Sequence, residues 1–179
     1  IDFSRYFNEV LRGLNIAYGA EYRIDNYTIF AGEEGSWFNY GGLFIDGGDT
    51  TTRPGGSQGF PGFQPSDVTD EYRSNVGVYL DVEADITNDF ALSAALRYED
   101  YSDFGNTITG KLAARYAISD KYAIRGSVSN GFRAPSLAQI YYNTSFTNFS
   151  SSGATEVLLS GNESPVTKAF GIGKLNEEK

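Results

Sequence analysis

Strict alternation of apolar and polar residues is the feature that most constrains the fold of this chain. Between residues 76 and 86 one parity is wholly apolar, and it consists of Val76, Val78, Leu80, Val82, Ala84 and Ile86. The opposite parity of the same segment carries Asp81, Glu83 and Asp85. Side chains alternate between the two faces of a β-strand, so this segment predicts a strand with one apolar and one acidic face. A helix would not separate the two kinds of residue in this way.

The same period of two recurs along most of the chain. We predict antiparallel up-and-down strands at residues 1–9, 14–30, 72–86, 90–102, 107–118 and 121–133. The joints near residues 11–13, 87–89 and 119–120 are short, and they would share one end of the sheet because successive joints alternate between its ends. Long loops at residues 31–70 and 134–179 would lie at the other end. In the second loop, Ser136 and Ser164 each begin a sequence typical of a short helical turn.

Two fold classes are compatible with this alternation. One is a soluble antiparallel β-sandwich, a carbohydrate-binding or adhesive domain, which must bury Val78, Leu80 and Val82 against a second sheet. The other is an all-β fold in which the chain supplies a partial segment, about six strands, of a transmembrane β-barrel. The apolar parities of the clearer strands hold no charge for about ten residues each, which suits a bilayer crossing. Aromatic residues near both ends of these faces, such as Phe90 and Tyr98, also favour the barrel.

The composition excludes several classes of function. The chain has no Cys and no His, which excludes thiolate or imidazole metal sites and a Ser-His-Asp relay within it. It has 23 acidic and 14 basic residues, and its net charge of -9 argues against nucleic-acid binding. We therefore predict that it is not an enzyme, and that it has no catalytic residue, no metal site and no cofactor.

Charged residues of both signs gather on the polar parity of the strands. We expect this set to face the lumen of the barrel, and it comprises Glu21, Arg23, Asp81, Glu83, Asp85, Arg97, Glu99, Arg115, Arg125 and Arg133. Carboxylates stay ionised at little cost in a water-filled lumen, so these charges do not indicate acid–base catalysis. Arg133 lies where the last strand ends, and it is either a loop or lumen contact or an anchor that donates to loop carbonyls. We prefer the anchor, because its guanidinium offers five donors in a fixed fork.

The long loops are where a ligand would be contacted. Aromatic residues of the first loop are candidates for stacking on a sugar or an aromatic ligand, and they are Trp37, Phe38, Tyr40, Phe60 and Phe63. The alternative is that they pack the loop onto itself. Asp46 and Asp49 could offer oxygen ligands to Ca²⁺, but their spacing fits a plain turn better.

Four stretches of the chain resemble a known family. The specific ones are Arg97–Gly105, which reads Arg-Tyr-Glu-Asp-Tyr-Ser-Asp-Phe-Gly, and Gly131–Leu137, which reads Gly-Phe-Arg-Ala-Pro-Ser-Leu. Gly19–Arg23 and Gln58–Phe63 fit the same family further upstream. Together they resemble the β-barrel domain of TonB-dependent outer-membrane receptors. The resemblance covers nearly the whole chain and is weakest in the loops.

The resemblance implies a fold, a location and partners. Receptors of this family are barrels of about 22 strands, closed by an N-terminal plug. They import scarce ligands such as ferric siderophores, cobalamin, haem or glycans with energy delivered through TonB. We therefore expect a middle slice of such a receptor, without its plug, in the outer membrane of a Gram-negative bacterium. It would contribute barrel wall and extracellular loops, contact outer-membrane lipid, and depend on TonB through a plug domain outside this chain.

Overall fold

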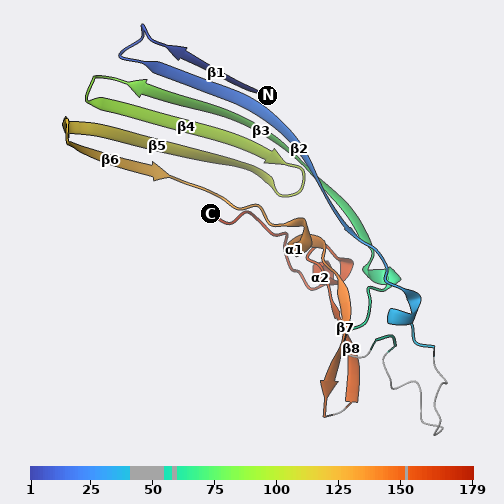
Figure 1. The fold of residues 1–179 in the computed structure, drawn as a ribbon. Helices are drawn as coiled ribbons and strands as arrows, with labels where there is room; N and C mark the ends of the chain where they lie inside the picture. Colours follow the sequence, from blue (N-terminus) through green and yellow to red (C-terminus); the bar gives the residue numbers. More distant parts are fainter. Residues whose placement is uncertain (41–54, 58–59, 152) are drawn as a thin grey trace. The chain divides into compact units, whose positions relative to one another are not determined.

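The computed structural model describes residues 1–40, 55–57, 60–151 and 153–179 (Figure 1). Asp46 and Asp49, considered above as calcium ligands, lie outside these ranges. The chain divides into two compact units. The first comprises residues 1–25, 73–134 and 176–179, and the second comprises residues 26–72 and 135–175.

A six-stranded sheet forms most of the first unit. Its strands, in chain order and in spatial order, are β1 (Asp2–Phe7), β2 (Leu14–Ile29), β3 (Thr69–Asp85), β4 (Phe90–Tyr101), β5 (Gly105–Ser119) and β6 (Tyr122–Ser129). The pairing sets Val82 opposite Ala94 and Ala94 opposite Leu112, so the apolar parities of neighbouring strands share one face. β1 and β6 are the edges of the sheet, which is not closed (Figure 1). The predicted fold class, an all-β antiparallel sheet that forms part of a barrel, is confirmed.

Between Asn75 and Leu80, the burial pattern of β3 is the reverse of that of a strand in a soluble protein. On the apolar parity of β3, Val78 is 46% exposed and Leu80 is 47% exposed. On the polar parity, Asn75 is 1% exposed. Soluble sheets bury their apolar face and solvate the polar one. The sandwich alternative required Val78 and Leu80 to be covered by a second sheet, and the structure leaves both exposed.

Short turns join the strands at one end of the sheet. The β1–β2, β3–β4 and β5–β6 turns lie at this end, and the β4–β5 turn lies at the other (Figure 1). Leu11 adopts a positive φ of 57° in the first of these turns. In the second, the hydroxyl of Thr87 accepts hydrogen bonds from the backbone N–H of Asp89 and of Phe90. Such side-chain to backbone bonds stabilise tight polar turns.

β6 ends earlier than the predicted strand 121–133. The side chain of Asn130 accepts a hydrogen bond from the backbone N–H of Gly110 at 2.7 Å and donates one to the carbonyl of Ile108 at 3.0 Å. These bonds occupy backbone groups on β5 that a longer β6 would use. Shortly after this point, Arg133 forms an isolated bridge with Glu178.

The second unit contains regular structure that the sequence did not predict. A hairpin of β7 (Thr144–Ser150) and β8 (Gly153–Leu159) lies between the helices α1 (Leu137–Tyr141) and α2 (Pro165–Ala169). The prediction of one long loop over residues 134–179 is therefore wrong in this part. The reason is that β7 carries polar residues on both parities, so its sequence shows no apolar face. The described residues of the unit also include two 3-10 turns, Glu34–Ser36 and Pro65–Asp67.

Both predicted helical turns are confirmed, and each is held by its N-cap serine. Ser136 accepts a hydrogen bond from the backbone N–H of Gln139, whose side chain accepts one from the backbone of Ser136, which is a capping box. Ser164 accepts from the backbone N–H of Thr167 at the start of α2. α1 buries Leu137 and Ile140 in the small core of the second unit. No helix in the described ranges is long and apolar enough to cross a membrane.

Candidate functional site

The polar face of the sheet carries an ion-pair cluster that spans three strands. Arg97 on β4 contacts Glu21 on β2 at 2.9 Å and Glu99 on its own strand at 3.0 Å. β3 lies between β2 and β4, so the guanidinium reaches over it. Gly77 of β3 makes this path available, because a Cβ there would lie 2.9 Å from Nη2 of Arg97. The absence of a side chain at one position therefore allows two nonadjacent strands to be linked.

A second polar contact crosses the same face toward the edge of the sheet. The hydroxyl of Tyr79 on β3 donates a hydrogen bond to Asp2 on β1 at 2.7 Å. Its ring lies against Gly19 of β2, where a Cβ would be 2.5 Å from the ring carbon Cε1. Gly77 and Gly19 thus have the same role. Gly77 lets the side chain of Arg97 cross β3, and Gly19 lets the side chain of Tyr79 cross β2.

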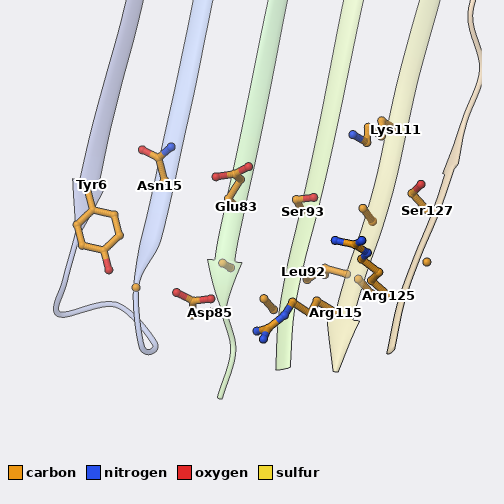
Figure 2. Close-up of a pocket in the computed structure, with 16 residues that line it drawn as sticks. Tyr6, Asn15, Glu83, Asp85, Leu92, Ser93, Lys111, Arg115, Arg125 and Ser127 are labelled. Atoms are coloured by element: carbon orange, nitrogen blue, oxygen red, sulfur yellow. The ribbon is translucent and has the colours of Figure 1, made fainter. Parts of the chain in front are cut away.

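A cavity of about 600 Å³ opens on the polar face near the short-turn end of the sheet (Figure 2). Glu83 and Asp85 of β3 line one side of it. Lys111 and Arg115 of β5 and Arg125 of β6 line the other, with β4 between the two groups. Among the described residues no ion pair joins these acidic and basic groups. The cavity therefore holds acidic and basic side chains that are not joined in ion pairs.

The structure brings together most, but not all, of the charged residues predicted to face the lumen. Glu83, Asp85, Arg115 and Arg125 line the cavity, while Glu21, Arg97 and Glu99 form the ion-pair cluster. Arg23 pairs with Asp25 on the same strand at 3.3 Å. Asp81 lies opposite Ala95, on the same parity as Glu83. Arg133 lies beyond β6, where its side chain contacts the carboxylate of Glu178 at 3.6 Å.

Arg73 forms a buried contact that the sequence did not single out. Its Nε and Nη2 atoms donate to Oδ2 of Asp103 at 2.8 and 2.6 Å, and Arg73 is only 5% exposed. The guanidinium also lies 5.7 Å from the ring centroid of Tyr101 and 5.4 Å from that of Phe104. These contacts connect β3 to the β4–β5 turn. A signal was present in the sequence, because Tyr101, Asp103 and Phe104 all belong to the stretch that carries the family resemblance.

The five aromatic residues predicted to contact ligand do not form one site. Trp37 and Phe38 meet edge to face with centroids 5.6 Å apart, and Phe38 meets Tyr40 at 5.0 Å. Phe63 instead contacts Tyr142, which follows α1. Phe60 is 90% exposed and belongs to neither group. In the first group, the indole N–H of Trp37 donates to the carbonyl of Gly32, so part of this cluster packs the loop onto itself.

The first aromatic group carries a perturbed phenol. The hydroxyl of Tyr40 donates to Oε1 of Glu34 at 3.2 Å. Reduced contact with solvent raises the pKa of Tyr40 above its ordinary value, and the hydrogen bond to Glu34 raises it further. Across the residues that the structure describes, no group of three or more acidic side chains is arranged to hold a metal ion.

Comparison with known proteins identifies the chain. A family model described as TonB dependent receptor-like, beta-barrel, matches residues 2–173. No solved structure matches the chain at a significant level. The matched range includes all six strands of the sheet as well as the β7–β8 hairpin. The chain belongs to the TonB-dependent receptor family, as part of its β-barrel domain.

Proposed function

We propose that this protein captures a scarce small molecule at the cell surface and imports it through the outer membrane. Membership of the family gives the chain a receptor and transport role at that membrane, with TonB and a small ligand as partners. The proposal adds the ligand class, which we take to be a ferric siderophore, cobalamin, haem or a glycan. It also assigns a role to this part of the receptor, which supplies barrel wall and extracellular loops.

The reversed burial of β3 between Asn75 and Leu80 is the observation that carries the proposal. An exposed row of Val76, Val78 and Leu80 would be a serious liability in water. In a bilayer the same row is the lipid-facing wall of a barrel, and the polar parity then faces the lumen. The wall contacts outer-membrane lipid, and the loops at the other end of the strands meet the ligand.

The unpaired charges of the lumen face have a function in this scheme. Glu83 and Asp85 lie on one side of the cavity and Arg115 and Arg125 on the other, without a mutual ion pair among the described residues. A plug domain seated in the barrel would offer partners for both groups, and TonB would act on the receptor through that plug. The charges are then docking contacts, and none of them needs a catalytic role. This agrees with the transporter nature of the family.

Fractionation and growth test the proposal together. The full-length receptor should be recovered in the outer-membrane fraction and should require detergent for extraction. A strain that lacks the receptor should grow poorly on one ligand class, supplied in turn as the only source of iron, cobalamin or carbon. A strain that lacks TonB should show the same defect. Recovery of the full-length protein in the aqueous phase without detergent would refute the proposal.

A further inference from the structure

A cavity of about 550 Å³ lies within the second unit. This volume falls in the range of small-molecule sites, which is about 300–1,000 Å³. Its walls come from the Pro65–Asp67 turn, the first residues of β3, both helices and the β7–β8 hairpin. Its polar lining includes Ser66, Glu71, Asn143, Ser145, Glu156 and Glu163. Ile140, Leu158 and Val166 add an apolar strip.

The hairpin directs one face into this cavity. Ser145 pairs with Leu158 in the β7–β8 register, and Glu156 shares the parity of Leu158 on β8. All three residues line the cavity. Ser145 is only 9% exposed, and its hydroxyl has no hydrogen-bond partner in the described part of the chain. The hydroxyl itself is not sealed from the cavity, so it can form a hydrogen bond to a group bound there.

The charge of the lining is one-sided. Among the described residues that line it there are three glutamates and no Lys or Arg. Two of the glutamates already have partners, because Gln64 donates to Glu156 at 2.7 Å and Lys168 pairs with Glu163. The carboxylate of Glu71 is half-buried and has no partner among the described residues. An ionised carboxylate only accepts hydrogen bonds, so a group bound beside Glu71 must be a donor.

We propose that this cavity binds a small polyhydroxylated solute that carries a protonated amine, with Glu71 recognising the amine and Ser145 a hydroxyl. An anionic solute would find no basic partner among the described lining residues and would be repelled by the glutamates. The apolar strip would contact the nonpolar faces of the rings. The inference rests on the proposed function, since it treats the cavity as a capture site for the imported ligand.

This assignment can be tested by titrating the purified full-length receptor, in detergent, with three disaccharides of similar size. The dissociation constant of each disaccharide is measured. The probes are the chitosan dimer, which is cationic, N,N′-diacetylchitobiose, which is neutral, and digalacturonate, which is anionic. We expect the chitosan dimer to bind about tenfold more tightly than the neutral probe, which is the effect of one charge-assisted hydrogen bond. Digalacturonate should not bind.

Three variants separate the two contacts. Glu71→Gln keeps the shape of the side chain and should remove the preference for the cationic probe while leaving binding of the neutral one unchanged. Ser145→Ala should weaken both probes by about threefold, the size of a neutral hydrogen bond. Glu33→Gln removes an equal charge from the same unit outside the cavity and should leave the affinity for each probe unchanged. Circular dichroism should show the same sheet content in all three.

The inference is overturned if digalacturonate binds as tightly as the chitosan dimer, if none of the probes binds, or if Glu71→Gln behaves like Glu33→Gln. These outcomes leave the proposed function open to its own test. A receptor that fails the titration but still supports TonB-dependent growth refutes the inference alone. A receptor found in the aqueous fraction refutes the proposed function, whatever the titration shows.

Discussion

At the scale of single residues, Arg73 shows how a barrel segment fixes a loop. Both of its donors that contact Asp103 come from one edge of the guanidinium, and two aromatic rings lie beside its plane. The charge is thus removed from water but remains paired. Such a pair adds little net stability compared with an apolar one, yet loss of one partner is costly, because it leaves the other buried and uncompensated.

We therefore expect Arg73→Ala to lower the free energy of unfolding by about 3 kcal/mol. Denaturant unfolding of the full-length receptor in phospholipid vesicles would measure it. Arg23→Ala is the matched control, because Arg23 pairs with Asp25 at an exposed position of the same sheet. That change should cost less than about 1 kcal/mol. Equal losses in the two variants would contradict the structural role assigned to Arg73.

Contacts between individual side chains are harder to predict from the sequence than strands or fold class. The parity of Glu21, Arg97 and Glu99 was readable, because alternation places all three on the polar face. Their contact was not, because it depends on which strands are neighbours and on an open path across β3. Likewise, Trp37 and Phe63 belong to one loop in the sequence but lie in separate aromatic contacts, since Phe63 meets Tyr142 from a distant segment.

At the scale of strands, Gly77 and Arg97 couple β2 to β4 across β3. Glycine weakens a strand interior, so its presence in β3 indicates a requirement for close approach. The requirement here is the passage of the Arg97 side chain toward Glu21. Glu21 is about half exposed, so the pair contributes only weakly to stability.

We expect Gly77→Val to abolish this coupling. A double-mutant cycle with Glu21→Gln and Arg97→Gln should give a small favourable coupling energy in the natural background and none in the Gly77→Val background. The coupling energy is the relevant readout, because valine also favours strands and can offset the loss in total stability. Gly126→Val is the control, since no atom lies within 4 Å of a Cβ added there. Coupling that survives in Gly77→Val would show that Arg97 has another path to Glu21.

Alternation also explains which strands the sequence could predict. β3, β4 and β5 each separate apolar from polar residues, because one face meets lipid and the other the lumen. β7 has no such separation, since Phe146 and Phe149 fall on opposite parities among Thr, Ser and Asn. A hairpin that packs within a loop unit does not meet two contrasting solvents. Its sequence therefore lacks the signal, and only tertiary contacts reveal it.

At the scale of the whole molecule, the exposed apolar face defines the environment in which this chain is stable. The face can be ordered by depth, because the strand registers align Ala94, Leu112 and Val128 in one row across β4, β5 and β6. Phe90, Tyr116 and Ile124 form a second row nearer the short turns. In an outer-membrane barrel the first row lies near the middle of the bilayer and the aromatic residues lie at its interface.

The depth order leads to a prediction that only a membrane barrel satisfies. Leu112→Arg places a charge in the central row, and we expect it to lower the free energy of unfolding in vesicles by about 2–4 kcal/mol. Tyr122→Arg places the same charge at the short-turn end of β6, beside the interface, and should cost only about 0–1 kcal/mol. In water alone both changes should cost no more than about 0.5 kcal/mol, because Leu112 and Tyr122 are both exposed. A smaller cost at Leu112 than at Tyr122 would contradict the assignment of this face to lipid.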